Sequence, residues 1–296
     1  MKISIIIPWY NTESLVDIHL SKVVEASKNP KNNIKEIIVV DDASKDKSVE
    51  FIKQKFPIIR LIRHKKNRGF SSTVNTGVRM AKGELVCLLN SDVSPETNFL
   101  EKIASDFGDD NVFGVSLNEI GVFGWAKGGF KDGFIVHAPG GKSELVHNTF
   151  WVSGGTGVYR RKTWIKIGGM DEKLFTPFYW EDLDLSYRAM KRGYILLWEP
   201  DAKVTHNHET TIGKISKSKV LAIQERNHLL FMWKNVTSKR LFGKHITGLL
   251  GRIAMHPGYL KIVFLALLKL SDIVKLRSKE VRESKVSDEA ILARFS

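Results

Sequence analysis

Residues 3–11 read ISIIIPWYN, a run of β-branched side chains that stops at Pro8. A short apolar run without polar alternation is typical of a strand buried on both faces of a sheet. Similar runs follow at 37–40 (IIVV), 58–62 (IIRLI) and 85–89 (LVCLL), and the segments 13–27, 49–56 and 73–81 between them carry apolar residues at helical spacing. Strands that alternate with helices predict an α/β fold, in which a mostly parallel sheet is covered by helices on both faces.

The composition is that of a globular protein, with 43% hydrophobic and 26% charged residues in a chain of 296. It excludes a disordered tail, a collagen-like fibre and a disulfide scaffold. The single cysteine, Cys87, can form no internal disulfide, and its place in an apolar run indicates no zinc site. No apolar run reaches the roughly 20 residues that a membrane-spanning helix needs, so we expect a cytoplasmic protein.

The charge of the chain is strongly positive. There are 46 Lys and Arg against 32 Asp and Glu, which gives a formal net charge of +14. Such an excess favours a polyanionic partner, and nucleic acid, anionic lipid headgroups and phosphorylated small molecules all meet that description. Charge alone does not choose among them.

Polar side chains follow three of the predicted strands at the point where each ends. The first strand ends in Pro8-Trp9-Tyr10-Asn11, the second in Asp41-Asp42, and the fourth in Asn90-Ser91-Asp92. Ligands of such sheets bind at the carboxyl ends of the strands. Turn and helix-capping roles explain any one of these groups, because Asn, Asp and Ser suit both jobs. Three strand ends together favour a binding site.

The pattern changes along the rest of the chain. Residues 109–149 are rich in glycine and aromatic side chains, which predicts irregular loops and short strands. A helix is expected over 182–192, with Gly193 after its last turn, and strands are expected at 195–198 and 202–205. Residues 222–235 and 249–277 are predicted to be helical and basic.

Seven motifs occur in an order that resembles the family 2 glycosyltransferases, which have the GT-A fold and invert the anomeric carbon. They are residues 4–11, 39–44, 67–70 with 75–77, 88–92, 154–155, 168–171 and 180–184. The resemblance covers roughly residues 2–235 and implies a GT-A domain over 1–235, followed by a basic, amphipathic helical extension over 236–296. The Leu-Asn-x-Asp form of residues 89–92 is most similar to rhamnosyltransferase-type members.

A divalent metal is implied by this resemblance. The donor of such an enzyme carries a diphosphate, whose leaving charge Mg²⁺ or Mn²⁺ neutralises as a Lewis acid. These ions prefer hard oxygen ligands. Asp92 matches the metal-binding acid of the family's Asp-x-Asp motif, whereas Asn90 replaces the first acid and is expected to hydrogen-bond the ribose or the surroundings of Asp92. His206 is expected to complete the metal or diphosphate site, with His208 as the alternative.

The resemblance also places donor-binding residues. Asp41 matches the carboxylate that hydrogen-bonds the nucleobase of a UDP- or TDP-linked donor, while Asp42 either fixes the loop or approaches the ribose. Pro8 and Tyr10 match the loop that lines the base and ribose. Arg68 matches a basic group near the base or the phosphates, and a solvated surface arginine is the alternative.

Residues 180–184 (WEDLD) carry the predicted catalytic base. An inverting transfer is a single displacement, so one carboxylate must take the proton of the acceptor hydroxyl. Asp182 matches the family's base, although a helix N-cap would also explain it. Trp180 and Glu181 are expected to contact the acceptor. Asp184 lies two residues further on, on a different side of a helix, and is expected to make structural hydrogen bonds or to pair with Arg188.

The predicted reaction is therefore transfer of a sugar from a nucleotide donor to a hydroxyl of a glycan or lipid-linked acceptor in cell-surface polysaccharide synthesis. A dehydrogenase is excluded because no Gly-x-Gly-x-x-Gly follows the first strand. A non-catalytic protein that binds nucleic acid or an anionic surface is the alternative, but no recognition-helix, RNP or zinc-finger signature is present.

The stretch 259–269 (YLKIVFLALLK) leaves two alternatives open. It could lie in a membrane interface with its lysines toward anionic headgroups, which would make the protein peripheral on the inner face of the cell membrane. It could equally pack against the catalytic domain or against a second subunit of a homo-oligomer.

Overall fold

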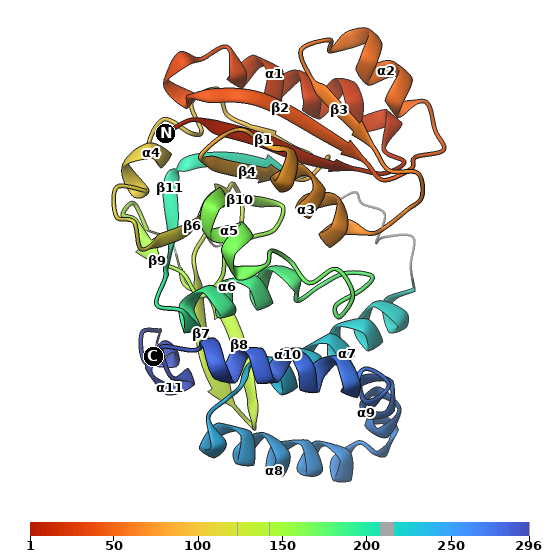
Figure 1. The fold of residues 1–296 in the computed structure, drawn as a ribbon, viewed down its shortest axis with the longest axis vertical. Helices are drawn as coiled ribbons and strands as arrows, with labels where there is room; N and C mark the ends of the chain where they lie inside the picture. The colour runs from red at the N-terminus through yellow and green to blue at the C-terminus, as the bar shows by residue number, and fades with distance from the viewer. Residues whose placement is uncertain (123, 142, 208–215, 296) are drawn as a thin grey trace.

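Helices cover both faces of a curled central sheet in the computed structural model, which describes residues 1–122, 124–141, 143–207 and 216–295 (Figure 1). The sheet has nine strands within these residues, in the order β3-β2-β1-β4-β10-β6-β11-β5, with β9 beside β11. Its strands are β1 (Ile3–Trp9), β2 (Ile34–Asp41), β3 (Arg60–Arg63), β4 (Leu85–Leu89), β5 (Val93–Pro95), β6 (Val112–Glu119), β9 (His147–Asn148), β10 (Thr156–Arg160) and β11 (Ile195–His206). A separate hairpin pairs β7 (Ala126–Lys131) with β8 (Phe134–Pro139).

The first half of the sheet confirms the predicted parallel arrangement. β1 pairs in parallel with both β2 and β4, and β2 pairs in parallel with β3. Their carboxyl ends therefore share one edge. The second half is mixed, because β10 runs antiparallel to both β4 and β6, while β11 runs parallel to β6 and antiparallel to β5.

Burial explains the unbroken apolar runs of these strands. Ile5 and Ile7 pack into one core on one face of the sheet, and Ile6 packs into a second core on the other. Every second side chain of a strand points to the same face, so a strand that is covered on both faces needs apolar residues at every position. On one side, the helix α3 (Phe70–Met80) packs so closely that a Cβ at Gly77 would lie 2.4 Å from the Ile6 side chain.

The helices follow the predicted alternation in the first hundred residues and dominate the C-terminal third. They are α1 (Ser21–Ser27), α2 (Ser48–Lys55), α3 (Phe70–Met80), α4 (Ile103–Asp106), α5 (Arg161–Ile167), α6 (Glu181–Lys191), α7 (Lys217–Asn235), α8 (Lys239–Met255), α9 (Leu260–Leu267), α10 (Leu270–Glu283) and α11 (Asp288–Leu292). Shorter helical turns are η1 (Glu13–Leu15), η2 (Val16–Leu20), η3 (Pro30–Asn32) and η5 (Pro257–Tyr259).

Three segments differ from the sequence prediction. Residues 112–119, in the segment expected to hold irregular loops and short strands, form the eight-residue interior strand β6, where Gly114 leaves room for the ring of Tyr159. The two strands expected at 195–198 and 202–205 are one strand, β11, whose pairing with β6 shifts register between Glu199 and Lys203. The helix expected over 249–277 is broken at Pro257, which has no backbone N–H to donate, and again between α9 and α10.

The C-terminal helices are joined to the rest of the protein by buried charges. The Lys191 ammonium at the end of α6 lies 2.7 Å from the carboxylate of Asp288 in α11, and both side chains are inaccessible to solvent. Lys191 also donates to the Asn235 carbonyl oxygen and to the Thr237 hydroxyl. In Figure 1, α10 lies alongside α7, and the C-terminus comes close to the β7–β8 hairpin.

Candidate active site

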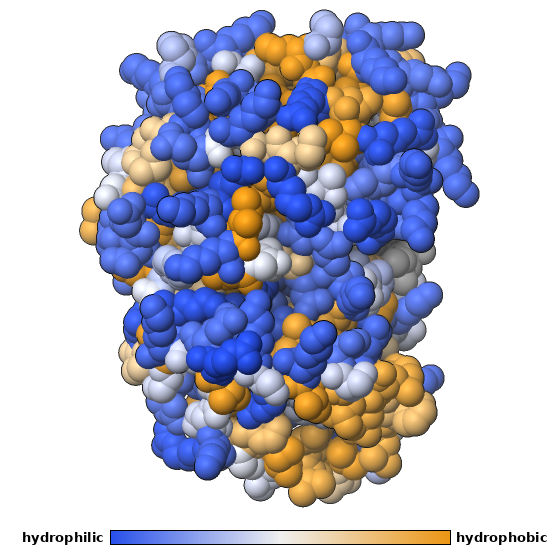
Figure 2. All heavy atoms as spheres, in the orientation of Figure 1, coloured by the Kyte–Doolittle hydropathy of each residue, from blue (hydrophilic) through white to orange (hydrophobic). Residues whose placement is uncertain are grey.

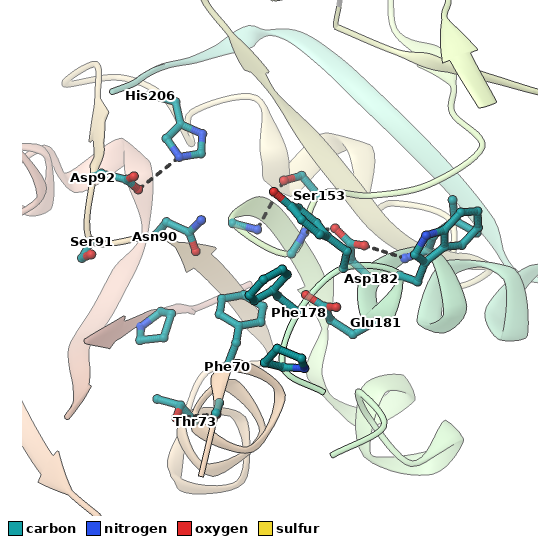
Figure 3. A pocket seen from close by; sticks show the side chains of 18 of the residues that line it. Phe70, Thr73, Asn90, Ser91, Asp92, Ser153, Phe178, Glu181, Asp182 and His206 are labelled. Carbon is teal, nitrogen blue, oxygen red and sulfur yellow. Dashed lines mark hydrogen bonds and ion pairs between the residues drawn. The ribbon is translucent and has the colours of Figure 1, made fainter. Parts of the chain in front are cut away.

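A cavity of about 1060 Å³ opens at the carboxyl edge of β1 and β4, between the sheet and the helices α6 and α7. Eight of the side chains that the sequence singled out line it, and they come from segments up to almost two hundred residues apart. They are Pro8, Tyr10, Asn90, Asp92, Trp180, Glu181, Asp182 and His206. Figure 3 shows Asp92 and His206 on one side of this cavity, with Asp182 and Glu181 on the other.

The Asp92–His206 pair occupies the sheet side. Antiparallel pairing of β11 with β5 sets His206 opposite Val93, and its Nε2 lies 3.1 Å from Oδ1 of Asp92 (Figure 3). Its Nδ1 lies 3.2 Å from Oε2 of Glu119, at the end of β6. Burial by itself lowers the pKa of His206, but the hydrogen bonds to the two carboxylates outweigh it and raise the pKa to about 9.

Asp92 offers an oxygen that suits a cation. Its side chain is almost fully buried, and its Oδ2 has no hydrogen-bond partner among the described residues. A buried carboxylate oxygen without a donor is costly unless a cation or a water accompanies it. Oδ2 of Asp92 therefore fits a divalent ion, whereas both ring nitrogens of His206 already contact carboxylates, so its role as a ligand stays a prediction. No cluster of three or more Asp, Glu, His or Cys that could hold a metal is found in the described part of the chain.

Asn90 is held in place by the strand next to β4. Its backbone N–H donates to the carbonyl oxygen of Gly155 at 2.9 Å. A Cβ at Gly155 would lie 2.4 Å from the Asn90 side-chain nitrogen, so only glycine leaves this amide its position beside the cavity. Pro8 and Tyr10 line the cavity from the end of β1, and the backbone N–H of Asn11 donates to the Ser44 hydroxyl at 2.9 Å.

The two aspartates after β2 are placed differently. Asp42 lines the cavity, and its carboxylate accepts the backbone N–H groups of Arg68 and Gly69 and contacts Nδ1 of His64 at 2.8 Å. Asp41 is fully buried outside the lining, where it lies 3.0 Å from Nε of Arg63. A role for Asp41 in binding the base stays a prediction.

Arg68 does not line the cavity. Its backbone holds Asp42, whereas its guanidinium extends to the surface and pairs with Glu172 at 3.1 Å. This geometry matches the alternative, a solvated surface arginine, more closely than contact with a phosphate. A role for Arg68 near the base or the phosphates stays a prediction. His208, the alternative to His206, lies outside the described residues.

The predicted base is held at the start of α6. Trp180, the residue before the helix, has a left-handed backbone with φ of 79°, which turns the chain so that Asp182 faces the cavity. The Asp182 carboxylate accepts the backbone N–H groups of Gly154 at 3.1 Å and Leu183 at 2.8 Å. Burial raises the pKa of Asp182, against the effect of these hydrogen bonds. The helix begins at Glu181, so Asp182 is in its first turn rather than at the N-cap.

The acids on either side of Asp182 have opposite environments. Burial and the charge of Asp182 raise the pKa of the Glu181 carboxyl to about 8. Asp184 is fully buried but lies 2.8 Å from Arg188 and 2.9 Å from Lys234, and these cations hold its pKa below the usual range. The predicted pairing of Asp184 with Arg188 is confirmed. Asp184 thus anchors α6, which leaves Glu181 and Asp182 as the acids of this segment that line the cavity.

Aromatic and imidazole rings that the sequence reading missed surround Asp182. The imidazole of His228 stacks on Trp180 at 4.2 Å, and His137 meets Trp151 and Trp180 edge to face. Burial lowers the pKa of His228 to about 3 and lowers that of His137 against the attraction of Asp182, so this wall is uncharged at neutral pH. His137 lies in β8, Trp151 in the segment before β10, and His228 in α7. None of the sequence motifs includes them.

Glu119 was also missed. It stands at the carboxyl end of β6 and contacts His206, so the strand-end pattern that marked Asp92 applies to it equally. The prediction of irregular loops and short strands over residues 109–149 did not place the end of a strand at Glu119.

The family model for "Glycosyl transferase family 2" matches residues 4–168, more than half of the chain. The chain belongs to the family 2 glycosyltransferases. The "Probable glycosyltransferase YdaM" of Bacillus subtilis is 26% identical over 227 residues, which cover 72% of this chain and 52% of that protein. The match thus spans about half the length of YdaM and a smaller share of the length of other curated relatives, such as the pre-mycofactocin glycosyltransferase of Mycobacterium tuberculosis.

Solved structures confirm the GT-A glycosyltransferase fold. S. aureus TarS in complex with UDP-GlcNAc superposes with a TM-score of 0.61 at 16% identity, covering 95% of this chain and 83% of that one. The mannosyltransferase PcManGT from Pyrobaculum calidifontis, in complex with GDP-Man and Mn²⁺, gives a TM-score of 0.57 at 17% identity, covering 99% and 85%. This family 2 member therefore has a glycosyltransferase fold.

Proposed function

We propose that this glycosyltransferase performs a metal-assisted, inverting transfer of one sugar from a nucleotide donor to a hydroxyl of a glycan or lipid-linked acceptor in cell-surface polysaccharide synthesis. The observation that carries the proposal is the opposition, within one cavity, of the buried Asp92 carboxylate and its half-buried partner His206 to the half-buried Asp182 carboxylate. An inverting displacement needs this arrangement, because the leaving group and the base act on opposite sides of the anomeric carbon.

The charge of the cavity supports a divalent metal. Among the described residues, the lining includes six carboxylates and no lysine or arginine. A diphosphate would meet net repulsion there, which a divalent cation held by Asp92 and supported by His206 would remove. When bound, this ion neutralises the charge that builds up on the departing nucleoside diphosphate. That neighbours of this fold were solved with Mn²⁺ supports the same proposal.

On the acceptor side, the proposal assigns the proton to Asp182. The acceptor oxygen bonds to the anomeric carbon as the bond from that carbon to the diphosphate oxygen breaks, and the hydroxyl proton passes to the Asp182 carboxylate. The raised pKa of Asp182 makes it a stronger base than an exposed aspartate. Trp180 and Glu181 contact the acceptor, and the uncharged wall of Trp151, His137 and His228 offers aromatic faces to a sugar ring.

The donor assignments rest on the family resemblance and on position. Pro8, Tyr10 and Asn90 line the cavity beside Asp92, where base and ribose would lie. Solved neighbours bind UDP-GlcNAc and GDP-Man, which supports a nucleoside diphosphate sugar, and we retain UDP or TDP as its nucleotide. The rhamnosyltransferase-type assignment rests on the Asn90-x-Asp92 motif alone.

We assign catalysis to residues 1–235 and treat 236–296 as the helical extension. We also propose that the enzyme works in the cytoplasm, at the inner face of the cell membrane. No helix in the described ranges is long and apolar enough to cross a membrane.

Two variants test the proposed roles. Asp182→Asn keeps one acceptor oxygen but cannot take a proton, so the transfer rate should fall about 10²- to 10⁴-fold while donor binding stays unchanged. Asp92→Ala should weaken donor binding in the presence of Mn²⁺ and have little effect when a chelator is present. Calorimetric titration with UDP, with and without Mn²⁺, measures binding, and release of nucleoside diphosphate measures transfer.

Asp110→Asn is the matched control, because the Asp110 side chain is 99% exposed. It should leave both measurements unchanged. Full transfer activity in Asp182→Asn would refute the base assignment, and Mn²⁺-dependent binding that survives in Asp92→Ala would refute the metal assignment.

A further inference from the structure

The corner formed by α8, η5 and α9 exposes an unusual number of large apolar side chains. We call six of them the apolar corner: Leu250, Met255, Leu260, Phe264, Leu267 and Leu268. Their exposed fractions range from 46% to 73%. Figure 2 shows a broad hydrophobic patch at the lower right, over the place that α9 and the adjoining end of α8 occupy in Figure 1.

The exposure follows from the orientation of α9. Ala266 is fully buried and Val263 packs against the core, so the inner face of this helix is already occupied. Leu260, Phe264 and Leu268 recur every four residues along the outer face. A helix on a water-exposed surface carries polar residues on that face. The outer face of α9 is therefore suited to an apolar neighbour, which the described residues do not supply.

The charges around the corner indicate the chemistry of that neighbour. Residues 236–296 contain twelve Lys and Arg against five Asp and Glu, a net charge of +7 and half of the whole chain's excess. Four of the five acids are already engaged in ion pairs with Lys191, Arg192 or Arg240; they are Glu280, Glu283, Asp288 and Glu289. In the part of the chain that the structure describes, Lys261, Lys269 and Lys275 form no ion pair. The surface thus combines exposed apolar side chains with an excess of positive charge.

We propose that the apolar corner docks on an anionic lipid bilayer, with α9 lying in the interface and Lys261, Lys269 and Lys275 against the headgroups. Amphipathic helices bind membranes through this combination of buried apolar area and attraction to anionic lipid. A second copy of the chain suits the surface less well. A symmetric contact through this patch would bring the same lysines toward one another.

The corner is connected to the cavity through α7. Leu221, Gln224, Glu225 and His228 of α7 line the cavity. Glu225 accepts hydrogen bonds from Arg252 of α8 at 3.0 Å and from the Tyr259 hydroxyl of η5 at 2.9 Å. One wall of the cavity is therefore tied directly to the docking surface. Where the proposed function holds, the acceptor reaches Asp182 from the bilayer, as the sugar-bearing end of a membrane lipid.

Vesicle flotation of the full chain tests the docking. The wild-type protein should float with vesicles of phosphatidylcholine and phosphatidylglycerol, and not with phosphatidylcholine alone. The double variant Phe264→Asp with Leu268→Asp should bind at least about tenfold more weakly. The matched control, Ile58→Asp with Leu145→Asp, changes two equally exposed apolar residues outside residues 236–296 and should bind like the wild type.

A second variant removes charge without touching the apolar residues. Lys261→Gln with Lys275→Gln should weaken binding to anionic vesicles about thirtyfold, because each lysine near an anionic surface contributes about 1 kcal/mol. Equal flotation of the wild type and both variants would overturn the proposal. Failure of the wild type to float would do the same. A dimer in light scattering that Phe264→Asp with Leu268→Asp dissociates, without vesicle binding by the wild type, would instead assign the corner to a second copy.

Mn²⁺-dependent binding of UDP, measured without vesicles, separates this proposal from the proposed function. A wild-type protein that binds UDP but does not float with vesicles would refute the docking proposal and leave the proposed function standing. Flotation in a protein that does not bind UDP would leave the docking surface standing and refute the enzyme site.

Discussion

Replacing Glu181 by glutamine is expected to stabilise the protein at alkaline pH and to leave its stability nearly unchanged in mild acid. The Glu181 side chain is only 7% exposed, and its Oε2 has no hydrogen-bond partner among the described residues. Burial and the neighbouring Asp182 carboxylate raise its pKa from the usual 4.5 to about 8. The folded protein therefore holds this proton over a pH range in which the unfolded chain releases it.

The sign and size of the effect follow from that difference. Below pH 4.5 both states are protonated, and Glu181 imposes no ionisation cost on folding. As pH rises toward about 8, the unfolded state gains from losing the proton, and the folded state loses relative stability. The pKa difference between the unfolded and folded states, from 4.5 to about 8, amounts to about 5 kcal/mol at about 1.36 kcal/mol per pKa unit. Glutamine does not ionise, so the variant escapes this loss.

Urea unfolding between about pH 5 and about pH 9 measures the effect. The free energy of unfolding of Glu181→Gln minus that of the wild type should grow with pH and level off above about pH 8. Glu50→Gln, at an exposed glutamate of α2, is the control and should show no such trend. A difference that stays constant across this pH range would refute the reasoning about Glu181.

An acid that costs stability beside the predicted base also has a functional consequence. If Glu181 contacts the acceptor, Glu181→Gln should transfer more slowly than the wild type although it is more stable, the trade-off expected at active sites. A variant that is more stable and transfers at the wild-type rate would remove Glu181 from the acceptor site.

Two further variants test the packing that positions the site. Lys191→Met should destabilise the protein by about 3–5 kcal/mol in urea unfolding, because it leaves the buried Asp288 carboxylate without its cation, and an unchanged midpoint would contradict this. Gly155→Ala should lower the affinity for donor, because the new Cβ would displace the Asn90 side chain. The control is Gly243→Ala, where a Cβ meets nothing within 4 Å, and it should leave the affinity unchanged. Equal donor affinity in the two variants would count against the placement of Asn90.

Much of the fold could be predicted because its signals are local. Unbroken apolar runs such as residues 3–7 and 85–89 require burial on both faces of a sheet, and polar residues directly after them mark the binding edge. The parallel order of β1, β2 and β4 then brought Tyr10, Asn90 and Asp92 to one cavity. Local pattern was sufficient there, since strand direction and burial together define that edge.

Other site residues could not be recognised locally. Asp41 and Asp42 are adjacent in sequence, yet only Asp42 reaches the cavity, because alternate residues at a strand end point in opposite directions. His137 and His228 lie outside any motif, and only the packing of the β7–β8 hairpin and α7 around Trp180 brings them into the site. Contacts between distant segments have no fixed spacing in the chain.

The α/β fold, the binding edge and the basic excess can be predicted from the amino-acid sequence, because apolar periodicity, polar residues at strand ends and charge are properties of neighbouring residues. The exposed face of residues 260–268 cannot be predicted in this way, since the helix could have turned its leucines inward. Its inner face is filled by Val263 and Ala266 against the core, so Phe264 and Leu268 face outward. The orientation of α9 depends on which surfaces of the folded protein are left for it to cover, and a local sequence pattern does not predict this.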